Sequence, residues 1–254
     1  MKTKKEIALI TGGSRGIGKN IALKLAEKGF DIIITYRKEI VEAEKVVEEI
    51  EHIGGKAVAI KLSQEQLDRF DSFFCQLKHI LLDEFHTDHF NYLINNAGIG
   101  LSAPFCDTTE EQFDLLMNTL FKGVYFFTQK TLQYLNDNGG IINISSRLAQ
   151  ASVPGYSAYA SMKSAIEALT RYEAKELSIR GIRVNSIAPG PIATDFADGV
   201  IRDDAEYNAK LKAMTPFGRI GVPDDIGGVV AFLCTKEAAW LNGQRIEISG
   251  GMNL

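Results

Sequence analysis

Short, nearly continuous apolar runs alternate along the chain with longer stretches in which apolar residues recur at helical spacing. Strands are predicted where the runs are rich in Ile and Val, at residues 6–11, 31–36, 56–62, 90–96, 140–146, 182–188 and 244–249. Helices are predicted between them, at residues 16–28, 39–53, 64–84, 110–135, 157–179 and 223–234. Strands that are apolar on both sides are typical of a parallel sheet buried between helices.

The alternation of strand and helix predicts an α/β fold. Repeated βαβ units with right-handed crossovers give a Rossmann-type doubly wound parallel sheet of about seven strands with helices on both faces. The sequence has no linker or repeat, so residues 1–254 are expected to form a single domain. The irregular segment 189–222 is rich in Gly, Pro and Asp. It is either a substrate loop, at about residues 190–222, or a tolerated surface loop.

Composition narrows the class of protein. The 254 residues are 45% hydrophobic and 24% charged, which is ordinary for a globular protein. A formal net charge of −4 argues against a nucleic-acid partner, because phosphate binding needs a basic face. The three cysteines, Cys75, Cys106 and Cys234, are far apart, which favours free thiols in a reducing compartment. The first apolar run is too short for a signal peptide or a membrane span, so a cytoplasmic protein is expected.

A glycine-rich turn, "TGGSRGIG", follows the first predicted strand and opens the first predicted helix. Gly12, Gly16 and Gly18 allow a tight turn, close approach of a ligand to the backbone, and close packing of helix on strand. The helix N-terminus offers N–H groups and a partial positive charge to a pyrophosphate. The alternative is a glycine-rich turn without a ligand.

With Thr11 included, the turn reads TGxxxGxG and resembles the cofactor turn of the short-chain dehydrogenase/reductase family. Further motifs of that family follow in order: "NNAG" at 95–98, "ISS" at 144–146, "YASMK" at 159–163 and "PGPIAT" at 189–194. The resemblance spans nearly the whole chain and extends to 3-oxoacyl-(acyl-carrier-protein) reductase-like members. It implies an oxidoreductase that transfers a hydride between a nicotinamide and a carbonyl or alcohol, and a homo-oligomer, either a dimer or a tetramer.

The end of the second predicted strand bears on the choice of dinucleotide. Tyr36 and Arg37 stand there, where a carboxylate would bind the ribose 2′-hydroxyl of NAD and repel a 2′-phosphate. Arg37 can form a charge-assisted pair with that phosphate, and Arg15 can approach it from the glycine turn. These residues favour NADP(H) over NAD(H). The alternative for Arg37 is a solvated residue at the start of a helix.

The resemblance implies three catalytic residues: Ser146, Tyr159 and Lys163. Tyr159 and Lys163 are four apart and share a helix face, so the lysine can stabilise the phenolate, helped by an oxidised nicotinamide. Ser146 is expected to hold the substrate oxygen, whereas Ser145 is expected to point to the opposite face. Tyr156 is a rival phenol that lacks a lysine four residues later.

The resemblance also implies a set of cofactor-binding residues: Gly12, Ser14, Arg15, Gly16, Ile17, Gly18, Arg37, Asn95, Ala97, Gly98, Tyr159, Lys163, Pro189, Gly190, Ile192 and Thr194. Thr194 and the Ile192 backbone are expected to lie against the nicotinamide. Lys163 is also expected to bind the hydroxyls of the nicotinamide ribose.

Two positions depart from the family pattern. Lys61 or Leu62 stands where the family usually has an Asp that binds the adenine. Leu120 stands where it usually has an Asn that completes a proton relay through a water to the lysine. Asn118 lies about 200° around the helix from position 120, although any backbone carbonyl there is able to bind the relay water.

Several functions remain open on the sequence alone. The leading interpretation is an NADP(H)-dependent carbonyl reductase or alcohol dehydrogenase, of which a 3-oxoacyl-(acyl-carrier-protein) reductase is one version. Carrier docking needs cations near the entrance; Arg180 is available, but Asp137 lies in the 136–140 turn. The alternative is a non-catalytic nucleotide-binding or sensing module on the same fold. We expect no metal site, because Asp83, His86 and His89 fit a solvated helix end better.

Overall fold

Seven parallel strands form one sheet in the order β3-β2-β1-β4-β5-β6-β7. The computed structural model describes residues 5–252. The strands are β1 (Ile7–Ile10), β2 (Asp31–Tyr36), β3 (Ala57–Lys61), β4 (Phe90–Asn95), β5 (Leu135–Ile144), β6 (Arg183–Pro189) and β7 (Arg245–Ile248). The predicted doubly wound parallel sheet is therefore confirmed.

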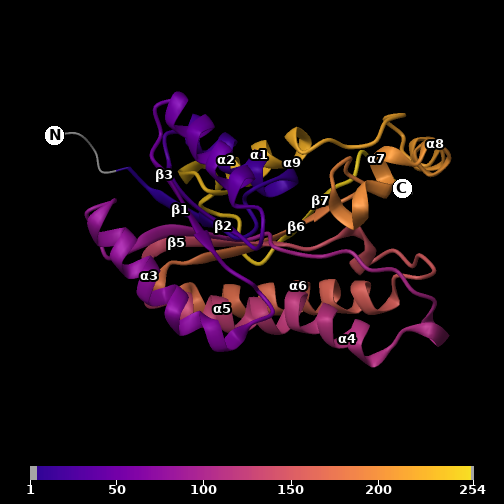
Figure 1. Ribbon diagram of the computed structural model, residues 1–254, viewed down its shortest axis with the longest axis horizontal. Coiled ribbons are helices and arrows are strands. Elements are labelled where there is room, and N and C mark those ends of the chain that lie inside the picture. Colours follow the sequence, from indigo (N-terminus) through magenta and orange to yellow (C-terminus); the bar gives the residue numbers. More distant parts are fainter. Residues whose placement is uncertain (1–4, 253–254) are drawn as a thin grey trace.

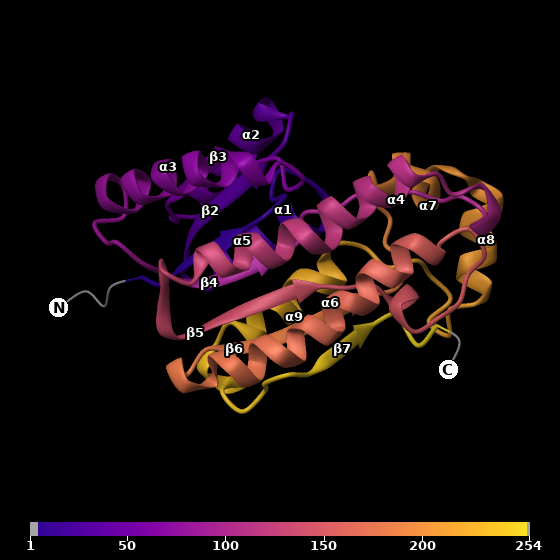
Figure 2. The same ribbon diagram turned by 90° about the horizontal axis from the view of Figure 1, so that it is seen from below.

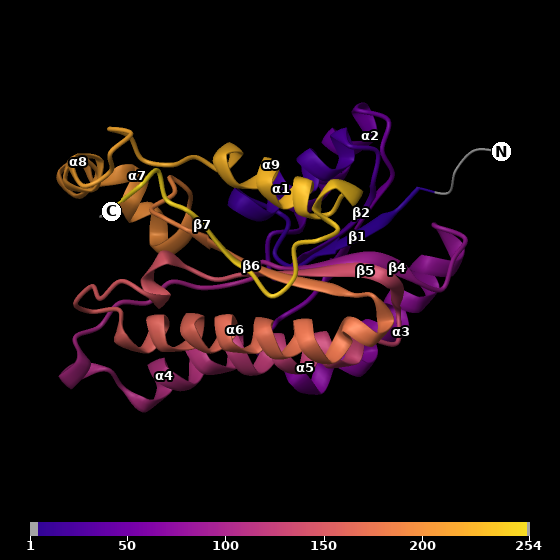
Figure 3. The ribbon, with the colours of Figure 1, turned by 180° about the vertical axis from the view of Figure 1, so that it is seen from behind.

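Helices cover both faces of the sheet (Figure 1). One face carries α1 (Gly16–Glu27), α2 (Ile40–His52) and α9 (Asp224–Leu233). The other carries α3 (Phe70–Asp83), α4 (Glu110–Met117), α5 (Gly123–Thr131) and α6 (Ser157–Glu176), with α5 and α6 running along the strands (Figure 2). Two short helices, α7 (Val200–Asp203) and α8 (Ala205–Ala213), lie beyond one end of the sheet (Figure 3).

The core is divided into two layers by the alternation of side chains along each strand. Ile10, Ile34 and Ile94 pack with α1, α2 and α9. The neighbouring positions, Leu9, Ile33 and Leu93, pack with α3 and α5 on the other face. All six of these side chains are buried, which explains why the strands read as unbroken apolar runs.

Two predicted elements differ from the structure. The single helix expected at 110–135 is interrupted by a π-helical turn at Asn118–Lys122. Gly123 follows this turn, and a Cβ there would lie 2.2 Å from the Gln64 carbonyl oxygen, so only glycine permits the approach. The segment 189–222, expected to be irregular, contains α7 and α8. Ala197, Asp198 and Gly199 precede these helices in the left-handed conformation.

The strand order reverses between β1 and β4, which places a topological switch point there. Ligands of doubly wound folds bind outside the carboxyl ends of the strands at such a point. Among the described residues, 5–252, the helices are too short or too polar for any of them to traverse a lipid bilayer.

Candidate active site

The glycine-rich turn joins β1 to α1 at the switch point. Gly12 and Gly16 adopt positive φ angles of 66° and 56°, which glycine tolerates without strain. The Gly12 N–H donates to the Thr35 hydroxyl at 3.1 Å, which ties the turn to the end of β2. No side chain within residues 5–252 caps α1, so its first N–H groups are available to an anion such as a phosphate.

Asn96 holds the turn from the other side. Its amide donates to the carbonyls of Thr11 and Gly12 at 2.9 and 3.0 Å. The side chain of Asn95, by contrast, is buried and donates to Thr128 and Asn143 at 2.9 and 2.8 Å. These bonds brace β4 against α5 and β5, so the side-chain amide of Asn95, a residue expected to bind the cofactor, is engaged within the protein. Asn96 was missed, although the doublet in "NNAG" signalled it.

The edge of the sheet beside the turn is positively charged. Tyr36 and Lys61 pair in register at the ends of β2 and β3, so neither strand ends in a carboxylate. Arg37, Lys38 and Lys61 are exposed, and none of them forms an ion pair within the described part of the chain. Arg15 lies 3.9 Å from Asp195. This charge suits a phosphate better than a free ribose hydroxyl.

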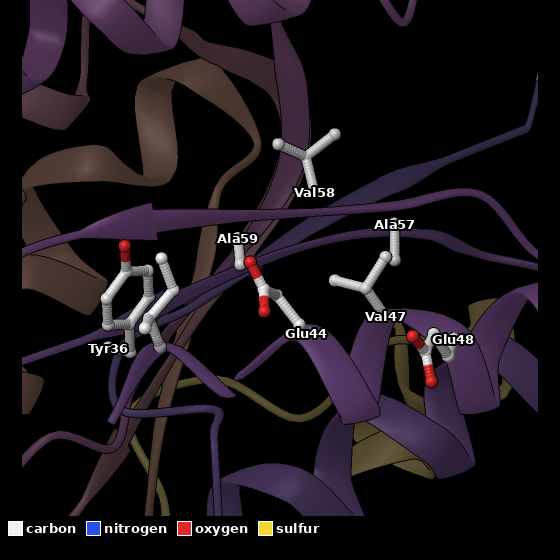
Figure 4. A pocket seen from close by; sticks show the side chains of 8 residues that line it. Tyr36, Glu44, Val47, Glu48, Ala57, Val58 and Ala59 are labelled. Carbon is white, nitrogen blue, oxygen red and sulfur yellow. The ribbon is translucent and has the colours of Figure 1, made fainter. Parts of the chain in front are cut away.

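A shallow hollow on the outer side of this edge lies between α2 and β3 (Figure 4). Tyr36, Ala57 and Ala59 line it from the strands, and Glu44 and Glu48 line it from α2. The two carboxylates make it unsuited to a phosphate. This hollow is therefore a poor candidate for the phosphates of a nucleotide, in contrast to the glycine turn.

Ser146 and Tyr159 meet at the carboxyl end of β5. Tyr159 is in the first turn of α6 and is only 7% exposed. The Ser146 side chain lies beside its phenol and lowers the pKa of that phenol. The hydroxyl of Ser145 instead donates to Glu167 at 2.8 Å, on the other side of the strand. The structure thus places Ser146, and not Ser145, beside the phenol.

The ionisation of this pair differs from the expectation. Burial raises the pKa of Tyr159 to about 12, against a smaller lowering by the Ser146 bond and a further rise from Tyr156. Burial lowers the pKa of Lys163 to about 8. The Lys163 Nζ donates to the Ile144 carbonyl at 2.7 Å and lies 5.9 Å from the centre of the Tyr159 ring. The net effect of the protein is to raise the pKa of Tyr159, because burial outweighs the lowering by Ser146. The lowering expected from Lys163 together with an oxidised nicotinamide stays a prediction.

Position 120, which packs against Tyr159, carries an apolar side chain. Leu120 is buried within the π-helical turn and belongs to a cluster with Leu116, Tyr159 and Met162. Its Cδ2 would lie 3.2 Å from a Cβ added to Gly98. No side-chain amide stands at position 120, as the sequence indicates, so only backbone groups are available there to hold a water.

Aromatic rings surround the phenol. The rings of Phe196 and Tyr156 stand edge-on to Tyr159, with centroids at 6.1 and 6.3 Å. Phe196 belongs to the segment after "PGPIAT", where Thr194 lies beside Gly16 of the glycine turn. This segment therefore reaches both the turn and the phenol. Phe196 was missed by the sequence analysis, although an aromatic residue in the expected substrate loop was a usable signal.

Arg180, the histidines considered as metal ligands, and the cysteines are not part of the candidate active site. Arg180 donates to Asp137 at 2.7 Å and to the Leu132 carbonyl at 2.8 Å, so its guanidinium is engaged within the chain. Within residues 5–252, no cluster of three or more His, Cys, Asp or Glu is arranged to hold a metal ion. The free cysteines Cys75 and Cys106 are exposed, and Cys234 is buried.

The fold and the site together define the class of Rossmann-type, nucleotide-dependent oxidoreductases. A family model described as enoyl-(acyl carrier protein) reductase matches residues 12–253. The hydroxynaphthalene reductase-like protein Arp2 of Metarhizium brunneum is 36% identical, over 97% of this chain and 94% of its own length. The 3-oxoacyl-(acyl-carrier-protein) reductase FabG of Staphylococcus aureus is also 36% identical, over 96% and 97%. The chain belongs to the short-chain dehydrogenase/reductase family.

Solved structures agree with this assignment. The angucycline C-6 ketoreductase LanV, crystallised with NADP bound, matches with a TM-score of 0.92. It is 34% identical, over 97% of this chain and 95% of its own. These relatives are reductases by name, so they lend no support to the alternative of a non-catalytic module.

Proposed function

We propose that the protein is an NADP(H)-dependent ketoreductase. The observation that carries this proposal is that Ser146 lies beside Tyr159, at the carboxyl edge of the sheet near the glycine turn and one helical turn from Lys163. An NADP-bound relative of the same fold supports the choice of cofactor. The positive edge around Arg37 and Lys61 supports it independently.

The residues have distinct roles in the proposal. The glycine turn and the N-terminus of α1 hold the pyrophosphate, while Arg15 and Arg37 hold the 2′-phosphate. The nicotinamide, when bound, supplies the hydride. Ser146 donates a hydrogen bond to the substrate carbonyl, and the Tyr159 hydroxyl gives its proton to the developing alkoxide. Lys163 would hold the hydroxyls of the nicotinamide ribose, and its Nζ, 5.9 Å from the centre of the Tyr159 ring, would place positive charge behind the phenol.

The substrate proposed is a ketone attached to a flat ring. Phe196 and Tyr156 form aromatic walls beside Tyr159, and Leu101 and Leu148 pack into the same cluster. The named activities of Arp2 and LanV concern polycyclic aromatic compounds, which supports this choice. FabG supports a carrier-linked substrate instead. Arg180 is engaged internally, however, and lies on the order of 30 Å along α6 from Tyr159.

A panel of ketones with NADPH and NADH tests the function. 1-Tetralone and 1-decalone share a bicyclic skeleton and differ in aromaticity, and an acetoacetyl thioester represents the carrier-linked class. We expect NADPH oxidation with kcat/KM about 2- to 10-fold higher for the tetralone, because aromatic contacts add roughly 0.5–1.5 kcal/mol. If no ketone is turned over faster than by a Tyr159→Phe control, the proposal is wrong.

Cofactor preference depends on Arg37. The Arg37→Asp variant removes a charge-assisted bond and introduces a carboxylate that repels the 2′-phosphate. We expect the KM for NADPH to rise about 10- to 100-fold, since such a bond contributes roughly 1.5–3 kcal/mol, while the KM for NADH stays the same or falls. Lys38→Asp makes the same change of charge at the next residue and is the control. An equal rise in both KM values, or an equal effect of Lys38→Asp, would contradict the assignment.

Assembly and location complete the proposal: a cytoplasmic homodimer or homotetramer. Large apolar side chains stand exposed on the described chain, among them Trp240 at 98% and Ile179 at 92%. Exposed side chains of this size are common at subunit interfaces.

A further inference from the structure

A buried acid, Glu167, lies one turn beyond Lys163 on α6. Tyr159, Lys163 and Glu167 are spaced by four residues, so all three lie along one face of the helix. Glu167 is 6% exposed, as Lys163 is. A carboxylate this deeply buried is costly unless it is paired and hydrogen-bonded.

Three segments of the chain supply the partners of Glu167. Ser145, at the end of β5, donates to its Oε1 at 2.8 Å. Arg245, at the start of β7, donates to the same oxygen at 2.8 Å. Gln150, from the turn after Ser146, donates to Oε2 at 3.3 Å. A single side chain on α6 therefore joins the ends of two strands and a loop.

Ser145 connects these bonds directly to the proposed catalytic residues Ser146 and Lys163. Ser145 directly precedes Ser146, and its hydroxyl also lies 3.2 Å from the Lys163 carbonyl oxygen. The Lys163 ammonium donates to the carbonyl of Ile144, on the other side of Ser145. The backbone of Ser146 and the backbone of Lys163 are thus fixed to each other through Ser145 and Glu167.

A second ionic link holds Ser146 from its other side. Arg147 lies 3.3 Å from Glu247 and donates to the Met252 carbonyl at 3.1 Å. Glu247 in turn accepts from Arg245 at 3.0 Å. Charges of alternating sign therefore run from Glu167 through β7 and back to the residue after Ser146.

We propose that Glu167 is a positioning residue for ketone reduction: through Ser145 and Arg245 it fixes Ser146 and Lys163 relative to Tyr159. The inference rests on the proposed function of that site. Its physical basis is that hydrogen-bond donors to a reacting oxygen act only when they are held in place, and a misplacement of about 1 Å costs about 10²-fold in rate.

A double-mutant cycle on Ser145 and Glu167 tests the proposal. Ser145→Ala removes the hydroxyl, and Glu167→Gln removes the charge while it keeps the shape of the side chain. We expect each to lower kcat about tenfold, below the loss for a full 1 Å displacement, with the KM for NADPH unchanged. The double variant is expected to be little slower than the slower single variant, because both changes weaken the same Ser145–Glu167 link: Ala removes the donor, and Gln keeps an acceptor oxygen but not its charge.

The control is Glu173→Gln. Glu173 is another acid on α6, and it accepts a hydrogen bond from Asn143 of β5 at 2.9 Å, but its partners do not adjoin Ser146 or Lys163. We expect kcat to stay unchanged in this variant. If Glu173→Gln lowers kcat as much as Glu167→Gln, the positioning role of Glu167 is refuted, because any buried acid on the helix would then have the same effect.

A pH profile separates positioning from stability. A bond from Ser146 lowers the pKa of Tyr159, so a displaced Ser146 leaves that pKa higher. For alcohol oxidation by Ser145→Ala, we expect the rising limb of the plot of kcat against pH to move to higher pH. This variant leaves no buried charge without a partner. It therefore still tests the proposal if Glu167→Gln fails to fold. Unchanged kcat and unchanged limb in Ser145→Ala would overturn the inference. Full turnover by Tyr159→Phe would instead overturn the proposed function.

Discussion

Replacement of Tyr159 by Phe is expected to lower kcat for ketone reduction by about 10²–10⁴-fold, the usual contribution of a positioned proton donor. The variant loses only the hydroxyl, which lies beside Ser146 and gives its proton to the alkoxide in the proposed reaction. The ring remains to pack against Tyr156 and Phe196, so the fold is retained. Steady-state NADPH oxidation measures the rate, and fluorescence titration with NADPH measures binding.

Tyr156→Phe is the matched control for this result. Tyr156 is a phenol in the same cluster, 6.3 Å from Tyr159 between ring centres, but Ala160 and not a lysine stands four residues later. We expect kcat to change by less than about threefold, since its ring is kept. A larger loss of kcat in Tyr156→Phe than in Tyr159→Phe would contradict the proposal and identify Tyr156 as the proton donor.

Replacement of Lys163 by Met is expected to abolish turnover and, at pH 7, to stabilise the cofactor-free fold. Burial lowers the pKa of Lys163 to about 8, so the unfolded chain binds this proton more tightly than the folded chain. The penalty is fully present below pH 8 and disappears as the pH rises through about 10.5, the ordinary lysine pKa. Met removes it, which raises the free energy of unfolding at pH 7 by about 1–3 kcal/mol, net of the lost bond to the Ile144 carbonyl.

Urea unfolding at pH 7 and near pH 10.5 measures this effect. The gain from Lys163→Met is expected at the lower pH and lost at the higher one. Lys175→Met, an exposed position on the same helix, is the control and should change stability little at either pH. A Lys163→Met protein that is less stable than the parent at pH 7 would show that the buried ammonium is held favourably.

The fold follows from local patterns because each strand needs cover on both faces. Ile32, Ile33 and Ile34 are consecutive, and they alternate between the two core layers. Such a run satisfies both layers at once, so it identifies a central strand without knowledge of its neighbours. The π-helical turn around Leu120, by contrast, could not be predicted from a local pattern. It accompanies the close approach of Gly123 to the carbonyl of Gln64, a residue far outside the helix in sequence.

The helices in segment 189–222 were not predicted, although a local signal for one of them was present in the sequence. Asp204 caps α8 by accepting from the Tyr207 N–H at 2.9 Å, so a local start signal was present in the sequence. It was obscured by the glycine, proline and aspartate of the preceding residues. Ala197 and Asp198 adopt left-handed conformations that their residue types do not predict, because only the surrounding contacts hold them there.

The sequence alone determined the alternation of elements, the glycine turn, and the spacing that puts Tyr159 and Lys163 on one helix face. These features depend on periodicity and on residue types within a few positions of one another. Only the tertiary structure decided that Asn96 and not the Asn95 side chain secures the turn, that Lys163 donates to a β5 carbonyl, and that Phe196 stands against the phenol. It also brought Ser145, Glu167 and Arg245 together. Those three residues come from β5, α6 and β7, and burial of the acid forces a pairing that no local pattern encodes.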